Sequence, residues 1–209
     1  GKSLVNGFEN WVNDFQDQMP QMVDKSPFEV GKILANTPGK VVYRNDLMEL
    51  IQYEAKTDQV HQTPVLITPP WINKFYILDL NEKKSFVRNL VNNGFTVFMI
   101  SWKNPTTELR NTSLDDYMMM GPIKGMTVVQ EITGAENIHA VGYCIGGSLL
   151  ATTMGWLKGP QKKVRNLFTS FTLLTTLVDF SKPGDLGLFV DEDSMKFVEK
   201  MMAEKGYLD

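Results

Sequence analysis

The chain holds a single cysteine, Cys144, within the sequence HAVGYCIGGS at residues 139–148. Glycines stand two positions before it and two positions after it, at Gly142 and Gly146, and a third follows at Gly147. A short apolar strand, an abrupt turn and a helix are typical of a nucleophile elbow, whose central residue has a strained backbone and a side chain clear of the sheet. We expect Gly142 and Gly146 to face each other across the turn, where any Cβ atom would clash, so the pattern G-x-C-x-G-G predicts an elbow that carries a thiol.

A thiol at the start of a helix can act as a nucleophile on an acyl group. The N–H of Ile145 lies at the predicted helix N-terminus, where it favours a thiolate and can form one half of an oxyanion hole. The alternative is a structural role, because a lone cysteine is commonly a small buried core residue and short glycine patterns also arise by chance. The apolar segments at 138–141 and 149–157 provide the strand and helix that the motif requires, and we therefore favour the nucleophile.

Acyl transfer by a cysteine also requires a base and a group that orients the base. The chain has two histidines, His61 and His139, and both precede Cys144. His139 lies in the strand that leads to the elbow and is expected to pack there, while His61 is expected to be exposed and incidental. The sequence thus carries a nucleophile and part of an oxyanion hole without the rest of a triad. We expect it to be a piece of a longer protein and to be inactive by itself.

Strands and helices alternate around the elbow. Short apolar strands are predicted at 41–43, 48–53, 64–68, 95–100, 138–141 and 167–174. This order predicts an α/β-hydrolase fold, in which a mostly parallel, doubly wound sheet begins with an antiparallel pair.

Capping residues mark the helices between these strands. Asn81 is expected to cap a helix that follows the 64–68 strand. Ser113 and Asp116 form a capping pair that begins a longer helix, which is expected to be interrupted near Gly121-Pro122 and closed by Gly134.

The chain divides into three predicted parts. Residues 1–40 form an N-terminal helix and a connecting arm, residues 41–179 form the first part of the α/β-hydrolase core, and residues 180–209 begin a cap or lid. The N-terminal helix is expected to stop by Pro20, and its apolar stripe is typical of core or interface packing. The stripe consists of Leu4, Val5, Phe8, Trp11, Val12 and Phe15.

Composition excludes several classes of protein. The chain is 43% hydrophobic and 22% charged, as in ordinary globular domains, and its net charge of −3 argues against a nucleic-acid partner. No apolar run approaches the roughly 20 residues of a membrane span. One cysteine cannot form an intrachain disulfide, so we expect a cytoplasmic location. No metal site and no cofactor site are predicted.

The chain resembles the class I polyhydroxyalkanoate synthases over almost its whole length, as the N-terminal region plus the first half of the catalytic domain. An ordered series of segments carries the resemblance: PFEVG (27–31), ANTPGKVV (35–42), PPWINKFYILDL (69–80), SWKNP (101–105), LDDY (114–117), GYCIGG (142–147) and LLTTLVDF (173–180). One such block would be weak evidence, whereas the ordered set is specific. Thr106 departs from the family, which commonly has aspartate at this position.

This resemblance implies an acyltransferase that joins (R)-3-hydroxyacyl groups, with 3-hydroxybutyryl-CoA expected, into a polyester with release of coenzyme A. By resemblance, Cys144 is the acylated thiol, and the Ile145 N–H pairs with a backbone N–H near Trp71 or Ile72 in the oxyanion hole. The family's catalytic aspartate and histidine lie downstream of residue 209. Coenzyme A is part of the substrate, so no cofactor is implied. Family members dimerise through the cap region and sit on polymer granules in the cytoplasm.

Two other functions remain open from the sequence. A cysteine-type α/β-hydrolase or depolymerase would use the same elbow with water as the acceptor, although the 69–80 block favours the synthase. A non-catalytic, granule-associated partner of the synthase is the other alternative, and the intact elbow argues against it.

Overall fold

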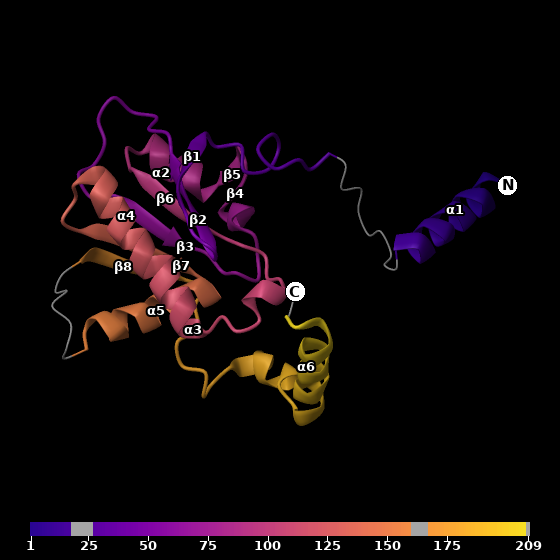
Figure 1. The fold of residues 1–209 in the computed structure, drawn as a ribbon. Coiled ribbons are helices and arrows are strands. Elements are labelled where there is room, and N and C mark those ends of the chain that lie inside the picture. Colours follow the sequence, from indigo (N-terminus) through magenta and orange to yellow (C-terminus); the bar gives the residue numbers. More distant parts are fainter. Residues whose placement is uncertain (18–26, 160–166, 208–209) are drawn as a thin grey trace.

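A six-stranded sheet forms the centre of the protein in the computed structural model, which describes residues 1–17, 27–159 and 167–207 (Figure 1). The strands stand in the order β1-β2-β6-β3-β7-β8. β2 is antiparallel to both β1 and β6, whereas β6, β3, β7 and β8 are parallel to one another. The strands span Gly39–Arg44 (β1), Met48–Tyr53 (β2), Val65–Thr68 (β3), Val97–Trp102 (β6), Ile138–Tyr143 (β7) and Phe168–Leu174 (β8). The predicted α/β-hydrolase architecture is confirmed.

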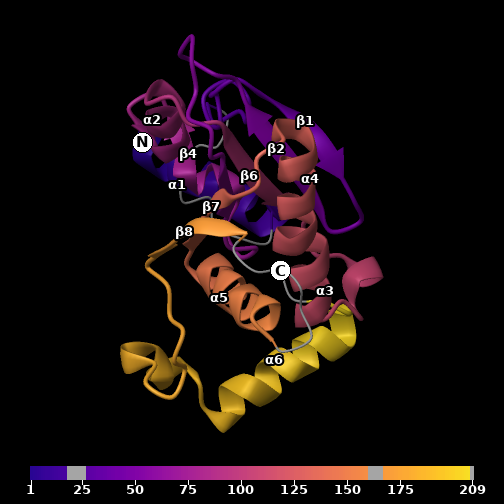
Figure 2. The same cartoon turned by 90° about the vertical axis from the view of Figure 1, so that its left-hand side faces the viewer.

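Helices connect the parallel strands and cover both faces of the sheet. Figure 2 shows α2 and α4 on opposite sides of the strands. The α-helices of this region are α2 (Phe86–Asn92), α3 (Leu114–Met118), α4 (Lys124–Thr133) and α5 (Ile145–Leu157). Shorter helical segments are the 3₁₀ turns η1 (Phe75–Leu78), η2 (Thr107–Leu109) and η4 (Gly184–Phe189) and the π-helical segment η3 (Met119–Ile123).

Alternate residues of the central strands belong to two hydrophobic cores, one on each face of the sheet. Leu66 of β3 belongs to a cluster that contains Val129 of α4, while its neighbour Ile67 belongs to a cluster that contains Val87 of α2. All four residues of β3 are buried. Because helices cover both faces, the central strands are continuous apolar runs rather than alternating ones.

The helix predicted after Ser113 has the expected start, interruption and end. The Ser113 hydroxyl and the Asp116 carboxylate form a capping box at the start of α3. The regular helix gives way to the π-helical η3, which contains Pro122, and then resumes as α4. Proline cannot donate the backbone hydrogen bond of a helix interior, which explains the change of pitch. Gly134 closes α4 with φ 68°.

The cap predicted at Asn81 is wrong. The helix α2 begins five residues later, where Ser85 accepts a hydrogen bond from the Arg88 N–H at 2.8 Å. The Asn81 side chain instead accepts bonds from the backbone N–H groups of Lys83 and Lys84, at 3.0 and 3.1 Å. It thereby forms the turn of a small hairpin between β4 (Asp79–Asn81) and β5 (Lys84–Ser85). Asparagine serves turns and caps by the same short-range bonding, so the sequence alone did not separate the two.

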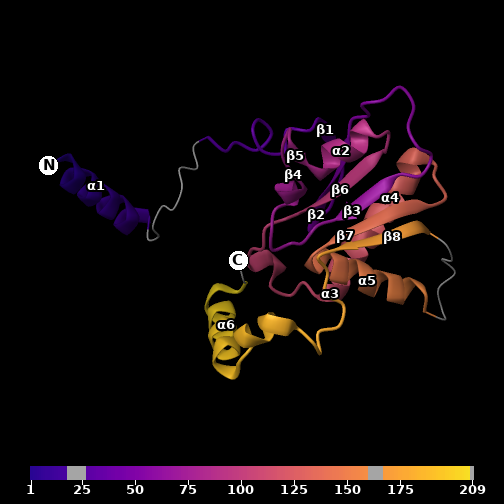
Figure 3. The same ribbon diagram turned by 180° about the vertical axis from the view of Figure 1, so that it is seen from behind.

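The N-terminal helix α1 (Lys2–Asp17) lies apart from the sheet and its helices (Figures 1 and 3). The predicted helix is present, but its apolar stripe is exposed, with Leu4 at 78% and Phe15 at 76%. Trp11 contacts the rings of Phe8 and Phe15 within the helix, with ring centroids 5.9 and 5.8 Å away. The stop predicted at Pro20 falls outside the described residues.

The segment after β8 ends in α6 (Glu192–Lys205), whose N-cap Asp191 accepts bonds from the N–H groups of Asp193 and Ser194. Hydrogen bonds from the backbone and hydroxyl of Ser194, with a smaller contribution from the Asp193 N–H, hold the pKa of the Asp191 carboxyl below its usual range. Within residues 1–17, 27–159 and 167–207, no helix has both the length and the apolar character needed to cross a membrane.

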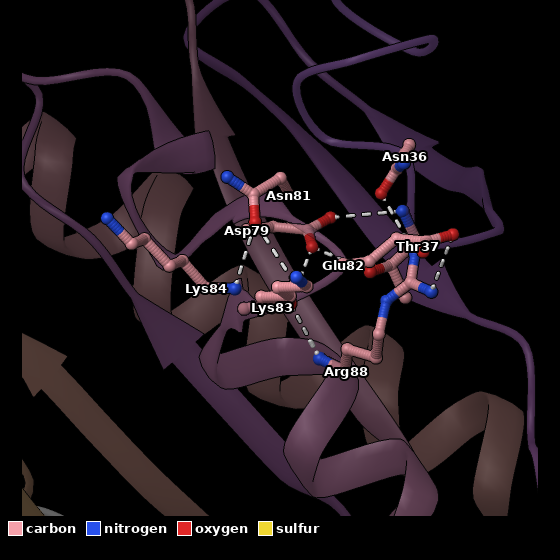
Figure 4. A network of polar contacts seen from close by, with 9 residues as sticks. Asn36, Thr37, Asp79, Asn81, Glu82, Lys83, Lys84 and Arg88 are labelled. Atoms are coloured by element: carbon pink, nitrogen blue, oxygen red, sulfur yellow. Dashed lines mark hydrogen bonds and ion pairs between the residues drawn. The ribbon is translucent and has the colours of Figure 1, made fainter.

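A buried polar cluster fastens the N-terminal arm to the chain that follows β3 (Figure 4). Asp79 is fully buried, and its carboxylate accepts hydrogen bonds from the hydroxyls of Thr37 and Ser85, both at 2.6 Å. Arg88 of α2 donates to the side chain of Asn36 at 2.9 Å. Burial, and then the charge of Asp79, raise the pKa of the neighbouring Tyr53 hydroxyl. The chain between β3 and β4 covers residues 69–78, and Asp79 is the first residue of β4. The cluster therefore fixes the far end of the segment that begins after β3.

We predict that Asp79→Ala lowers the free energy of unfolding of the protein by about 2–4 kcal/mol, since it leaves the buried Thr37 hydroxyl and the half-buried Ser85 hydroxyl without their acceptor. Asp79→Asn can keep the one oxygen, Oδ1, that accepts from both hydroxyls, and it should lose less. Asp58→Ala removes an exposed carboxylate and is the control, expected to change stability by less than about 0.5 kcal/mol. Urea unfolding measures all three. Equal midpoints for Asp79→Ala and Asp58→Ala would contradict the role given to the cluster.

Candidate active site

Cys144 has the backbone of a nucleophile elbow. It lies between β7 and α5 with φ 54° and ψ −131°, and its side chain is half-buried. A positive φ is strained for a residue with a Cβ atom, at a free-energy cost of about 1–3 kcal/mol. The strand before it and the helix after it are those that the motif predicts, so the turn presents the thiol at the carboxyl edge of the parallel sheet.

Each of the three glycines is required by a different neighbour. A Cβ at Gly142 would come within 3.0 Å of the Cα of Gly147. A Cβ at Gly146 would come within 3.0 Å of the carbonyl oxygens of Thr68 and Pro69, at the end of β3. The predicted clashes are therefore present, but Gly142 and Gly146 do not face each other as expected. Gly146 instead lets the first turn of α5 lie directly on the backbone that leaves β3.

The chain that follows β8 supports the elbow from the other side. Cys144 N donates to the carbonyl oxygen of Leu174 at 2.9 Å, and the Thr176 hydroxyl lies 3.3 Å from the carbonyl oxygen of Cys144. A Cβ at Gly147 would collide with the Thr176 side chain. Thr175, which lies between Leu174 and Thr176, has φ 44° and is a second strained residue beside the elbow. The sequence placed this segment in the LLTTLVDF block but assigned it no function, because its contacts join residues about 30 positions apart.

The start of α5 offers backbone donors beside the thiol. The N–H groups of Gly147 and Ser148 donate to the carbonyl oxygen of Cys144, at 2.9 and 3.3 Å. The first N–H groups of an α-helix have no partner within the helix, which applies here to Ile145 and Gly146. This is the position that the oxyanion-hole prediction assigned to Ile145.

The second predicted donor region, Trp71 and Ile72, lies in the loop between β3 and η1. The loop starts at Pro69, whose carbonyl oxygen lies against Gly146. Its two predicted residues differ in environment, since Ile72 is 71% exposed and Trp71 is half-buried. Further along the same loop, Lys74 donates a hydrogen bond to the side chain of Asn104, which follows β6. The structure thus brings the start of this loop to the elbow.

An aromatic cluster lies beside this loop. Trp71 packs against Tyr117 of α3 with ring centroids 4.8 Å apart, and Trp102 of β6 lies 5.2 Å from the same Tyr117 ring. Burial raises the pKa of the Tyr117 hydroxyl. The pKa of the neighbouring Asp116 is lowered by the hydrogen bonds that it accepts from the Ser113 backbone and hydroxyl.

The two histidines lie away from the thiol. His139 stands five positions before Cys144 along an extended strand, a separation of about 16 Å at roughly 3.3 Å per residue. Its Nδ1 lies 2.7 Å from the hydroxyl of Ser170. The rings of His61 and His139 both contact Phe95, with centroids 4.5 and 6.2 Å away. His139 therefore packs at the other end of the strands, and His61 is exposed there, as expected for each.

In the described part of the chain, histidine, cysteine and carboxylate side chains do not form a group of three that could hold a metal ion. Independently of this, the geometry of the elbow supports attack by a thiol on a carbonyl, with backbone N–H groups as the oxyanion donors.

Comparison with known proteins places the elbow in a family context. A sequence model described as the N-terminus of poly-beta-hydroxybutyrate polymerase (PhaC) matches residues 1–90. A poly(3-hydroxyalkanoate) polymerase from Methylorubrum extorquens is 44% identical over the whole of this chain, which covers 35% of that protein. The PhaC subunit of the polymerase from Cupriavidus necator is 40% identical over 95% of this chain and 33% of its own length. The chain spans about a third of the length of these curated relatives.

Among solved structures, esterase B from Lactobacillus rhamnosis superposes with a TM-score of 0.52 at 13% sequence identity. The match covers 97% of this chain and 67% of the esterase chain. Identity at this level shows the fold alone, and the fold is that of the α/β-hydrolases.

The collision at Gly147 predicts a specific rescue. Gly147→Ala places its new methyl against the Thr176 side chain, so it should destabilise the protein by about 2–4 kcal/mol. In the Thr176→Gly background the same change should cost at least about 1 kcal/mol less, because the obstructing side chain is gone. Gly142→Ala is the matched control. Its methyl meets backbone, so Thr176→Gly should not relieve it.

Thermal or urea unfolding of the three single and two double variants measures this coupling. A Gly147→Ala cost that is the same in both backgrounds would show that Thr176 does not close the space behind the elbow.

Proposed function

The chain belongs to the family of poly(3-hydroxyalkanoate) polymerases, and we propose that it carries the acylated thiol of such a polymerase. The substrate is an (R)-3-hydroxyacyl-CoA, with 3-hydroxybutyryl-CoA expected, and the products are a polyester and free coenzyme A. The observation that supports this best is Cys144 itself, at φ 54° between β7 and α5. Maintaining a strained turn for an inert thiol would cost stability without benefit.

In the first step, the Cys144 thiolate attacks the carbonyl carbon of the acyl-CoA thioester. A carbon–sulfur bond forms, and the carbonyl oxygen becomes an oxyanion that the Ile145 N–H and a backbone N–H near Trp71 or Ile72 stabilise. Collapse of this intermediate breaks the bond to the CoA sulfur, which leaves and takes up a proton. The acyl group then resides on Cys144 as a thioester.

In the second step, the hydroxyl of another 3-hydroxyacyl unit attacks the thioester on Cys144. Its proton passes to a base, an ester bond forms, and the Cys144 sulfur is released. A thiolate suits both steps, because it exchanges with a thioester at little free-energy cost and leaves readily when an alkoxide attacks.

The base and the group that orients it are proposed to come from chain beyond residue 209. Strand β8 lies at the edge of the sheet, pairs with β7 on one side, and is largely exposed. Further strands of the longer protein could pair with its other side. The segment after β8 also exposes apolar side chains, including Val178, Phe180 and Phe197 at 60–62%. A cap that dimerises over the site, and association with polymer granules in the cytoplasm, are part of the same proposal.

Incubation of the full-length protein with 3-hydroxybutyryl-CoA tests this function. We expect CoA release and polymer from the unsubstituted protein, and a loss of at least about 10³-fold in Cys144→Ala. Cys144→Ser is the matched control for side-chain size, and it should also lose most activity because a neutral hydroxyl is a weak nucleophile. Residues 1–209 alone should give no turnover.

Each other outcome contradicts one part of the proposal. Full activity in Cys144→Ala would remove the nucleophile. Free 3-hydroxybutyrate in place of polymer would indicate a hydrolase or depolymerase. No CoA release by the unsubstituted protein, with a thiol that still reacts with alkylating agents, would indicate a non-catalytic partner. Turnover by residues 1–209 would show that the downstream residues are not required.

A further inference from the structure

Trp102, the last residue of β6, bonds to the backbone at the start of the loop after β3. Its indole Nε1 donates a hydrogen bond to the carbonyl oxygen of Pro69 at 2.8 Å. The same oxygen is one of the two carbonyl oxygens that a Cβ at Gly146 would clash with. One carbonyl group therefore connects the indole, the beginning of the loop and the first turn of the helix that follows the nucleophile.

The indole of Trp102 also contacts the side chain of Trp71 in this loop. Trp71 and Trp102 pack edge to face, with ring centroids 6.2 Å apart and planes at 87°. Tyr117 contacts both rings, at 4.8 and 5.2 Å. Edge-to-face and tilted pairs of this kind are favourable beyond the area they bury. Trp102 thus holds the loop by its backbone at Pro69 and by its side chain at Trp71.

The far side of the indole is closed by the π-helical segment η3. A Cβ at Gly121 would come within 3.0 Å of the six-membered ring of Trp102, so only glycine allows the backbone this close. Asn45, at the β1–β2 turn, donates to the carbonyl oxygen of Met120 at 2.9 Å and holds η3 in place. π-Helical turns are frequent at functional sites, and here the turn makes room for one ring.

We propose that Trp102 is a positioning residue for acyl transfer at Cys144, acting through the Pro69 carbonyl. By holding that carbonyl, it fixes the start of the loop that carries the proposed donors, the backbone N–H groups at Trp71–Ile72. Trp102 does not touch the reacting atoms. This inference rests on the function proposed above, because an oxyanion forms only if Cys144 attacks a carbonyl.

The expected effect follows from the sensitivity of oxyanion stabilisation to distance. Loss of one oxyanion donor costs about 10²–10³ in rate, and a shift of about 1 Å can cost about 10². Alkylation of a thiol by iodoacetamide forms no oxyanion. Its rate therefore reports the reactivity and accessibility of the Cys144 thiol independently of the oxyanion donors in the loop.

Trp102→Phe in the full-length protein tests the inference, since phenylalanine keeps an aromatic ring but has no N–H donor. We expect CoA release in the first turnover with 3-hydroxybutyryl-CoA to slow about 10- to 100-fold, while iodoacetamide alkylation of Cys144 stays within about 2-fold. Trp11→Phe, on the exposed face of α1, is the matched control and should leave both rates unchanged.

Gly121→Ala is a second variant that keeps the indole N–H and pushes the ring from the opposite side, and it should give the same selective loss. Equal CoA release by Trp102→Phe and the unsubstituted protein would overturn the inference. A parallel fall in CoA release and alkylation would also overturn it, because that result indicates a general collapse of the site. Failure of the proposed function differs from both, since the unsubstituted protein would then release no CoA.

Discussion

A cysteine held at φ 54° and ψ −131° strains the backbone by about 1–3 kcal/mol, and the structure around Cys144 must offset that cost. The offset comes from both neighbouring strands. On the β3 side, Gly146 lets α5 lie against the carbonyls of Thr68 and Pro69. On the β8 side, the Leu174 carbonyl accepts the Cys144 N–H. The buried sheet is thus the support that keeps one turn in a conformation the chain would otherwise avoid.

The segments that surround this turn share one place in the fold. The carboxyl ends of parallel strands meet at one edge of the sheet, which is where α/β proteins place their ligands. The loop after β3, the end of β6 and the residues after β8 all leave the sheet at that edge, next to the elbow after β7. Two of the most distinctive blocks of the sequence, 69–80 and 173–180, are therefore distant in the chain, but both begin beside the elbow in space. The cluster at Asp79 and the indole of Trp102 then hold the first of these loops at its two ends.

Features that depend on local pattern could be predicted from the sequence. The apolar strands, the capping box at Ser113 and the interruption at Pro122 each follow from residue types a few positions apart. The elbow glycines also follow from the strained turn, although the contact partner of Gly146 proved to be the backbone after β3 rather than Gly142. Asn81 was misassigned because its side chain can serve a turn as well as a cap.

Features that depend on tertiary contacts could not be predicted. Thr176 and Trp102 act through carbonyl oxygens of residues 32 and 33 positions away, and no periodicity indicates such bonds. The apolar stripe of α1 identified a helix but not its partner, since Leu4 and Phe15 are exposed in the described structure. An apolar stripe predicts an amphipathic helix, but it does not identify the surface that packs against its apolar face.

The central claim is that the thiol of Cys144 becomes acylated, and the most direct measurement is the mass of the full-length protein after brief mixing with 3-hydroxybutyryl-CoA. Peptide mapping then locates any added group. The account predicts one 3-hydroxybutyryl group, or a short oligomer of it, on the peptide that contains Cys144. An unmodified Cys144 peptide, in a protein whose thiol still reacts with iodoacetamide, would contradict it.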